Sequence, residues 1–160
     1  MTADITFRPI TDDDLEFLCG LYASTREEEL KPVPWSDAEK ANFLRMQFHA
    51  QHVHYQNAFA DAQYLIILSG EELIGRLYLH RRDDEHRVVD IALLPAHRGR
   101  GLGTRILRDI QHEAAAAGKP VRIHVEMFNP AMHFYERLGF HRIADRGAYY
   151  LMEWTPDHTA

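Results

Sequence analysis

Hydrophobic and polar positions change their spacing several times along the chain, and each change predicts a new element. The segment 5–10 alternates and is rich in β-forming residues, so it predicts a strand. Two helices follow. The first begins at Thr11, where Asp14 completes an approximate capping box, and the second begins at Ser36, which forms a capping box with Glu39.

Each of these two helices carries one apolar face. Cys19 lies beside the face of the first helix, so we expect it in the core rather than at a reactive site. The proline-containing segment 31–35 cannot be helical and predicts the loop between the helices. The apolar positions are Leu15, Leu18, Leu21 and Tyr22 in the first helix and Ala41, Leu44, Phe48 and Tyr55 in the second.

Three alternating segments then predict three consecutive strands, which we expect to form an antiparallel meander. The strands cover residues 62–68, 73–80 and 87–94. The turn at 69–71 separates the first two strands, and a charged turn at 81–85 separates the last two.

Helical spacing returns near residue 102 and predicts a long amphipathic helix, which Gly118 ends. A β-branched strand follows at 121–125. Asn129 and Pro130 then predict the start of a short helix, because an N-cap residue precedes a proline at the first helical position.

Two closing strands at 140–144 and 149–154 complete the predicted order β-α-α-β-β-β-α-β-α-β-β. This order indicates an α+β (mixed α/β) fold with a sheet of about seven strands. The strand-helix-strand unit at 87–125 should be parallel and right-handed.

Composition indicates one ordinary globular domain spanning residues 1–160. The 160 residues are 46% hydrophobic and 26% charged, with a single cysteine, so no intramolecular disulfide can form. We therefore expect a reducing, cytoplasmic location. No apolar run approaches the ~20 residues of a membrane span, and the opening Met1-Thr2-Ala3-Asp4 does not begin a secretory signal.

The net charge of −6 argues against a nucleic-acid partner, which requires a basic footprint. It is weakly compatible with a cationic substrate such as an amine. A simpler interpretation is that the charge keeps a small domain soluble.

The segment 90–104 is the most informative part of the chain. A strand runs out at Pro95, glycines follow at 99, 101 and 103, and a helix begins within that run. Glycines allow close backbone approach, and a helix N-terminus attracts anions, so this turn predicts a phosphate or pyrophosphate site. A Walker A loop would require a lysine before Thr104, and a Rossmann fingerprint would place its third glycine one position later. A glycine turn without a ligand is the alternative.

Two motifs resemble those of one superfamily. Arg98, Gly101 and Gly103, placed after a strand that ends in Pro95, resemble the acyl-CoA-binding motif of the GNAT superfamily of N-acetyltransferases. The segment 129–140, Asn-Pro-Ala-Met-His-Phe-Tyr-Glu-Arg-Leu-Gly-Phe, resembles its second motif. The resemblance implies a GNAT-like fold, with a central, mostly antiparallel sheet, a parallel splayed pair and flanking helices.

The resemblance also implies a site for acetyl-CoA. Backbone amides of the glycine turn would hold the pyrophosphate, and a short pseudo-strand would bind the pantetheine arm, with the N–H of Leu93 as the oxyanion donor. Asn129 would contact the pantetheine, and Tyr135 would protonate the departing thiolate. Asn129 and Tyr135 lie one residue closer together than in many members. The implied cofactor-binding residues are Ile91, Ala92, Leu93, Arg98, Gly99, Arg100, Gly101, Leu102, Gly103, Thr104, Asn129 and Tyr135.

Tyr135 and Glu126 are the predicted catalytic residues. Tyr135 lies on the inward face of the short helix, where it is either a general acid or part of the core. An amine is mostly protonated at neutral pH, so a base or a water chain must remove a proton. Glu126 is the base we predict, His124 and Asp90 are the other candidates, and a paired or solvated role is open for each.

The acceptor side of the site is less defined. His49, His52 and His54 have no carboxylate or cysteine nearby to complete a metal site, so we expect no metal. The helix from Ser36 and the preceding loop could wall an acceptor pocket. The candidate acceptor contacts are Trp35, Tyr55 and Glu28.

The sequence therefore predicts acetyl transfer from acetyl-CoA to the primary amine of a small molecule or peptide, by a monomer or homodimer with no membrane partner. One alternative is a domain that binds acyl-CoA without turnover, as a sensor or interaction module. A second is a nucleotide-binding protein, which the missing lysine disfavours. The identity of the acceptor and the use of other acyl groups stay open.

Overall fold

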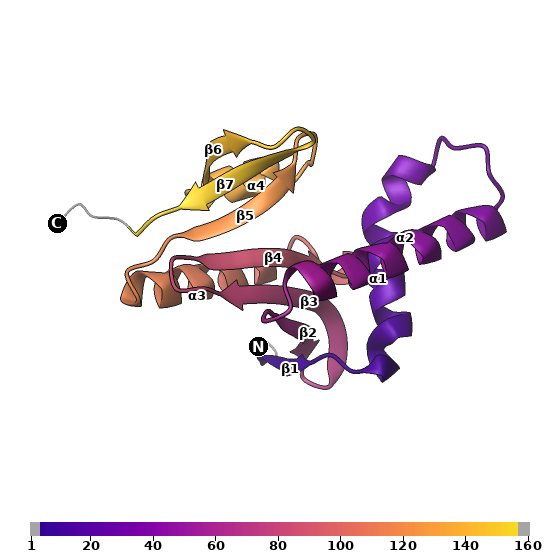
Figure 1. Ribbon diagram of the computed structural model, residues 1–160. Helices are drawn as coiled ribbons and strands as arrows, with labels where there is room; N and C mark the ends of the chain where they lie inside the picture. The colour runs from indigo at the N-terminus through magenta and orange to yellow at the C-terminus, as the bar shows by residue number, and fades with distance from the viewer. Residues whose placement is uncertain (1–3, 157–160) are drawn as a thin grey trace. The chain divides into compact units, whose positions relative to one another are not determined.

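The computed structural model describes residues 4–156. The predicted order of helices and strands is confirmed, with two short 3-10 turns, η1 (Asp12–Asp14) and η2 (Pro95–His97), added. Residues 1–3 and 157–160 lie outside the described residues. The predicted domain includes both segments, and the expected lack of a secretory signal concerns residues 1–3. The elements are β1 (Ile5–Pro9), α1 (Leu15–Leu30), α2 (Asp37–Ala58), β2 (Gln63–Ser69), β3 (Glu72–Arg81), β4 (His86–Leu93), α3 (Leu102–Ala116), β5 (Val121–Glu126), α4 (Met132–Arg137), β6 (His141–Asp145) and β7 (Tyr149–Trp154) (Figure 1).

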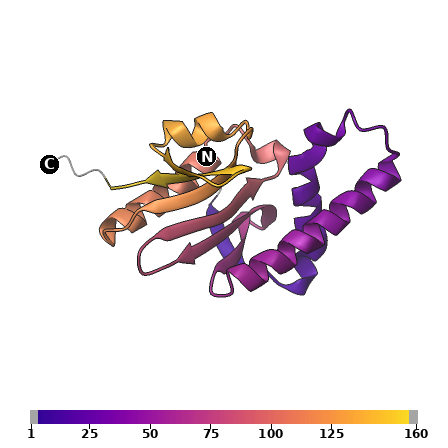
Figure 2. The same cartoon turned by 45° about the horizontal axis from the view of Figure 1, so that its top comes forward.

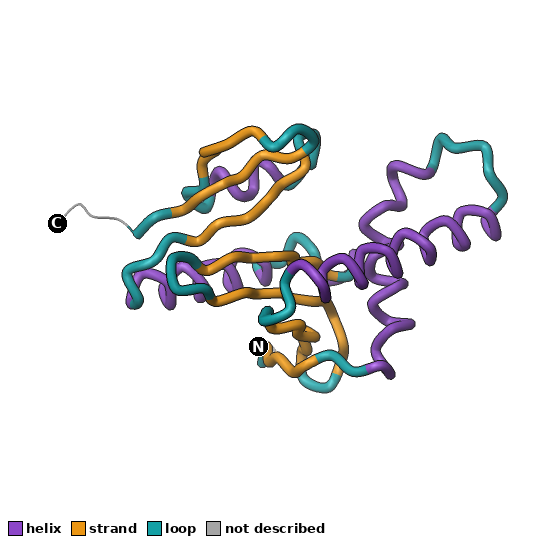
Figure 3. The backbone as a smooth tube through the Cα atoms, viewed as in Figure 1, coloured by secondary structure: helices purple, strands orange, loops and turns teal. Residues whose placement is uncertain are grey.

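The strands form one seven-stranded sheet in the order β1-β2-β3-β4-β5-β7-β6 (Figure 3). β1 with β2, β5 with β7, and β6 with β7 pair antiparallel, whereas β4 and β5 pair parallel. This confirms the predicted mixed, mostly antiparallel sheet and its parallel unit. The parallel register extends only from His86↔Val121 to Val88↔Ile123, although β4 continues to Leu93 and β5 to Glu126. The two strands therefore part beyond the third pair.

Contacts between Cα atoms group the chain into two compact units, which we describe separately. The first comprises Met1–Leu77 and Ile91–His97, and the second comprises Tyr78–Asp90 and Arg98–Ala160. β3 and β4 each contribute residues to both units. The single domain at 1–160 stays a prediction.

The first unit has its core between α1, α2 and β2 (Figure 2). Cys19 is buried, as predicted, and Leu44 and Phe48 are the buried residues of α2. Ala41 was expected on the apolar face of α2 but is exposed, because only a narrow strip of this helix meets the core. The core residues are Leu18, Cys19, Tyr22, Leu30, Leu44, Phe48 and Ile66.

The entry into α1 is fixed by Asp14. The predicted capping box is present, with the N–H of Thr11 donating to Asp14 Oδ2 at 2.8 Å, but the first turn is 3-10 and α1 begins only at Leu15. Arg8 from β1 donates two hydrogen bonds of 2.8 Å to the same carboxylate. These hydrogen bonds, of which those from Arg8 have the largest effect, lower the pKa of the buried Asp14 to about 2.

In the second unit, α3 packs its apolar face against β5, whose residues alternate between a buried and an open face. Val121, Ile123 and Val125 are buried. The side-chain amide of Gln111, in α3, donates to the carbonyl of Leu138 at 2.9 Å and so joins α3 to the end of α4. Between residues 4 and 156, no helix has the length and hydropathy that crossing a membrane requires.

Candidate active site

The turn between β4 and α3 has the backbone that the glycine pattern predicts. Gly99 and Gly101 have φ of 74° and 79°, in the left-handed region, and no atom would lie within 4 Å of a Cβ at either position. Gly101 is the N-cap of the 15-residue helix α3, and no side chain in the described part of the chain caps that end. The first N–H groups of α3 therefore have no capping side chain among the described residues, which leaves them available to an anion.

Gly103 has a different role, since it lies where α3 meets α4. A Cβ there would approach Phe134 Cζ to 3.4 Å, so only a very small residue fits without displacement. The remaining predicted loop residues, Arg98 and Arg100, are exposed, and Leu102 and Thr104 are half-buried. The second unit thus brings the whole predicted pyrophosphate loop together.

The predicted pantetheine segment, Ile91, Ala92 and Leu93, forms the end of β4 within the first unit and is half-buried. Gly75 in β3 allows this segment to lie close, because a Cβ at position 75 would clash with the carbonyl oxygen of Ala92. The N–H of Leu94 donates to the carbonyl of Ile74 at 2.8 Å. The oxyanion role of Leu93 stays a prediction.

Tyr135 is buried, at 7% exposure, on the inward face of α4. Its ring packs edge-on against Phe134 and Phe140, with ring centroids 5.3 Å and 5.9 Å away. Burial, and next the negative charge of Asp90, raises the pKa of the Tyr135 hydroxyl. Between residues 4 and 156 this hydroxyl makes no hydrogen bond. The phenol is therefore held protonated and has its proton available.

Asn129 stabilises the start of α4. Its Oδ1 accepts a 2.8 Å hydrogen bond from the N–H of Ala131, and its carbonyl accepts one of 3.0 Å from the N–H of Met132. The regular helix begins at Met132, later than predicted, because Pro130 and Ala131 form a turn that leads into it. The capping bond uses one lone pair of the Asn129 oxygen, and the amide nitrogen donates no hydrogen bond within the described residues, so this nitrogen is available to a ligand.

The candidate bases differ in their surroundings. Glu126 and His124 are both exposed on the open face of β5, and Asp90 is half-buried near the end of β4. Although the His124 side chain is exposed, partial desolvation by its neighbours and then the charges of Arg87 and Arg146 lower its pKa, against a smaller opposite effect of Glu85. His124 is therefore neutral at pH 7.

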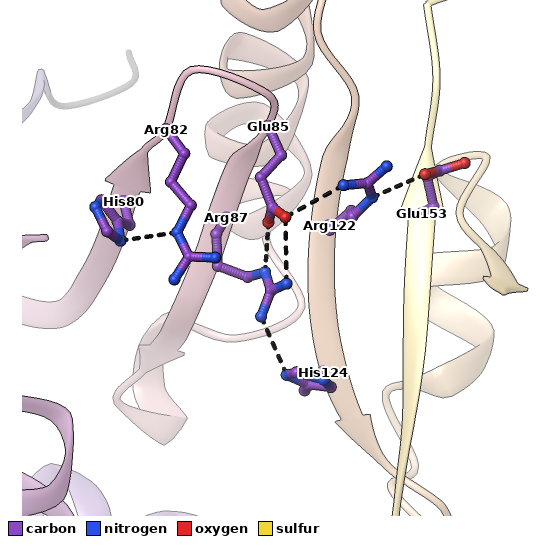
Figure 4. A network of polar contacts seen from close by, with 7 residues as sticks. All are labelled: His80, Arg82, Glu85, Arg87, Arg122, His124 and Glu153. Carbon is purple, nitrogen blue, oxygen red and sulfur yellow. Dashed lines mark hydrogen bonds and ion pairs between the residues drawn. The ribbon is translucent and has the colours of Figure 1, made fainter. Parts of the chain in front are cut away.

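A network of charged side chains lies beside His124, and it was not expected (Figure 4). Glu85 was predicted to lie in a charged turn, but the structure buries it at 4% exposure. It accepts hydrogen bonds of 2.6 Å and 3.3 Å from Arg87 and of 3.2 Å from Arg122, and Arg122 also donates to Glu153 at 2.8 Å. Burial alone would raise the pKa of Glu85, but these arginines outweigh it and hold that pKa below its usual range.

The alternation of β5 was the signal available for this network. Arg122, His124 and Glu126 alternate with buried residues, so the sequence places them on one face of a strand. The partners of Arg122, Glu85 and Glu153, lie 37 and 31 residues away from it along the chain. Only the strand order could identify them.

The three predicted acceptor contacts do not come together. Trp35 precedes α2 and packs edge-on against Phe43, with ring centroids 5.3 Å apart, whereas Tyr55 lies near the other end of α2. From Asp37 to Tyr55 the helix rises about 27 Å, at about 1.5 Å per residue. Glu28 pairs with Lys31 at 2.7 Å on the surface. A small acceptor therefore cannot contact both Trp35 and Tyr55.

The histidines of α2 pack rather than converge. His52 stacks on Phe48 with ring centroids 5.7 Å apart, and burial lowers its pKa. In the described part of the chain, no three His, Cys, Asp or Glu side chains are arranged to hold a metal ion.

The class of this chain is defined by comparison with protein families. The sequence model of the family described as "Acetyltransferase (GNAT) family" matches residues 22–140. The chain therefore belongs to the GNAT family of acetyltransferases.

Similar proteins agree with this family. A mycothiol acetyltransferase of Corynebacterium glutamicum (strain R) is 34% identical over 85 residues, which are 51% of this chain and 29% of that protein. The N-alpha-acetyltransferase RimI of Mycobacterium tuberculosis is 29% identical over 163 residues, covering 99% of this chain and 94% of RimI. The chain thus spans less than a third of the length of the mycothiol acetyltransferases it matches and nearly all of RimI.

A solved structure shares the fold. The PaiA N-acetyltransferase of Thermoplasma acidophilum, determined in complex with coenzyme A, superposes with a TM-score of 0.69 at 18% identity. The match covers 95% of this chain and 99% of PaiA.

Proposed function

We propose that this protein is an N-acetyltransferase that transfers an acetyl group from acetyl-CoA to a primary amine. The observation that carries this proposal is the uncapped N-terminus of α3 behind two left-handed glycines, in a chain that belongs to the GNAT family. The acceptor class, a small molecule or a peptide, follows the names of the similar mycothiol acetyltransferase and RimI. A cytoplasmic location and a monomeric or homodimeric state are parts of the proposal.

The residues of the glycine turn fit a CoA pyrophosphate. Open space around Gly99 and Gly101 leaves room for phosphate oxygens, and the N–H groups that begin α3 would donate to them. Arg98 and Arg100 add positive charge. When bound, acetyl-CoA supplies the activated acetyl thioester; Ile91, Ala92, Leu93 and Asn129 would hold its pantetheine arm.

Tyr135 would act as the general acid. Its raised pKa keeps the hydroxyl protonated across the physiological range, and the hydroxyl has no competing hydrogen bond among residues 4–156. A general acid must carry its proton before it gives it to the leaving sulfur, and the Tyr135 hydroxyl meets this requirement.

Glu126 would accept the proton of the amine. It is exposed on the open face of β5, beside the point where β4 and β5 part. A carboxylate there also attracts an ammonium group before deprotonation.

Thermal unfolding with acetyl-CoA, ATP or NAD tests the cofactor. Ligand at ~100 times its dissociation constant adds about 2.7 kcal/mol to the free energy of unfolding, so the melting temperature should rise by several degrees with acetyl-CoA alone. Thiol release is then measured with a panel of amines. Binding without thiol release would favour the sensor, and a shift with ATP or NAD alone would favour a nucleotide-binding protein.

A further inference from the structure

His124 is the first residue of β5 beyond its last parallel pair with β4, and its side chain lies on the open face of the strand. Figure 4 shows the Arg87 guanidinium group directed toward its ring, with Arg87 Nη1 3.4 Å from His124 Nδ1. All the residues of this argument belong to the second unit.

The buried carboxylate of Glu85 sets the direction of Arg87. It accepts from Nε and Nη2 of Arg87 and so leaves Nη1 directed toward His124. A guanidinium group has only donors, so the ring nitrogen that faces it must carry no proton. The proton of the neutral imidazole then lies on Nε2, and His124 presents an N–H donor on its far side. In this arrangement His124 has no free lone pair with which to act as a base.

A second donor lies at the same end of β5 as Glu126: the N–H of Arg146 donates to the carbonyl of Tyr149 at 2.7 Å, and Tyr149 is the register partner of Glu126. Arg146, in the exposed turn between β6 and β7, makes no ion pair or side-chain hydrogen bond within the described residues, and its charge acts on His124 in the same sense as that of Arg87. Arg87 and Arg122 are already engaged by Glu85 and Glu153.

Glu126 completes the pattern, because it follows His124 by two residues on the same face of β5. The Glu126 carboxylate thus shares one face of β5 with the His124 donor, and the cationic Arg146 lies across Tyr149 from it. An amine that also carries an anionic oxygen group is complementary to this arrangement: the amine faces Glu126 and the oxyanion faces the donors.

We propose that the acceptor carries an oxyanion group, a carboxylate or a phosphate, close to its amine, and that His124 Nε2 and the Arg146 guanidinium bind this group. This inference rests on the proposed acetyltransferase function and names its substrate class. Glu85 and Arg87 are positioning residues for His124.

Matched acceptors test the proposal through kcat/KM for thiol release from acetyl-CoA. The pairs are β-alanine with β-alaninamide, O-phosphoethanolamine with ethanolamine, and two C-terminally amidated peptides that differ only in an amino-terminal Asp or Asn. We expect at least one anionic member to exceed its neutral partner about tenfold, as for one charge-assisted hydrogen bond. The pair that shows the preference identifies the anionic group as a carboxylate or a phosphate, and shows whether a small molecule or a peptide carries it.

The variant R146Q should reduce that preference, the ratio of kcat/KM for the anionic acceptor to kcat/KM for its neutral partner, about tenfold. Its matched control is R142Q, which removes the same charge from the same hairpin, where Arg142 lies over the ring of Tyr150 at 4.3 Å. R142Q should keep the preference. Equal kcat/KM for anionic and neutral acceptors would overturn the inference and leave the acetyltransferase function standing.

Imidazole ¹⁵N NMR gives a readout that does not depend on turnover. We expect the His124 ring to be the Nε2–H tautomer, and N-acetyl-β-alanine, but not its amide, to shift its resonances in the unmodified protein and not in R146Q. An Nδ1–H tautomer, or equal shifts with both compounds, would overturn the inference. If no amine in the panel supported thiol release, the proposed function would be overturned. The NMR result would still decide whether the oxyanion site exists.

Discussion

Tyr135 combines a buried ring with a hydroxyl group that has no hydrogen-bond partner in the described structure, so its acid role can be separated from its packing. In Y135F the contacts with Phe134 and Phe140 are retained. We expect kcat to fall by about 10²–10⁴-fold and the melting temperature to stay close to that of the unmodified protein. Steady-state thiol release and thermal unfolding measure the two effects. Full turnover in Y135F would assign this residue to the core.

The proton acceptor can be identified by comparing substitutions at His124 and Glu126. Glutamine can replace the N–H donor of His124 but cannot act as a base, so H124Q should keep most of the turnover, whereas E126Q should lose it. The pH profile of kcat/KM distinguishes the two residues. Loss of turnover in H124Q with full turnover in E126Q would reverse the assignment.

The hydrogen bonds between Arg8 and Asp14 predict a pH-dependent contribution to stability. The folded state lowers the pKa of Asp14 from 3.8 to about 2. The contribution is therefore complete above the unfolded pKa and is lost as pH falls through about 2. We expect D14N to lower the free energy of unfolding at pH 7 by on the order of 2 kcal/mol, and the difference to shrink below pH 4. Urea unfolding across pH measures it, with D13N as the control on the same turn; an equal loss in both variants would contradict this account.

At the scale of elements, the two ends of α3 provide a matched pair of glycines. Gly101 and Gly118 have φ of 79° and 70°, and a Cβ at either would meet no atom within 4 Å. Alanine at either position should lower the free energy of unfolding by about 1–2 kcal/mol, because its Cβ strains a left-handed backbone. Only G101A should also reduce the thermal shift produced by acetyl-CoA, because it alters the turn that presents the helix N–H groups. An equal loss of the shift in G118A would show that strain, and not the turn, is responsible.

At the scale of the whole molecule, net charge and local charge act in opposite directions. A chain with a net charge of −6 repels an anionic acceptor, whereas the positive charge of Arg146 attracts it locally. Salt shortens the Debye length from about 30 Å at 0.01 M to about 3 Å at 1 M. We expect kcat/KM for the anionic acceptor to fall with NaCl and that for its neutral partner to stay constant. A rise with NaCl would show that the net charge dominates.

The sequence by itself determined the order of elements, the glycine turn and the position of Tyr135 in α4. These features depend on neighbours within a few residues: hydrophobic period, capping residues and glycines that adopt positive φ. The two motifs lie within this local part of the fold and were sufficient to indicate the family.

Tertiary structure decided what depends on residues distant along the chain. The order β5-β7-β6 brings Glu153 beside Arg122, and the pairing of β4 with β5 brings Arg122 to the buried Glu85. A charged residue at a turn is ordinarily solvated; burial of Glu85 is stabilised only because arginines from two strands meet it. The direction of Arg87 toward His124 follows from that pairing, and the proposed preference for an anionic acceptor rests on it.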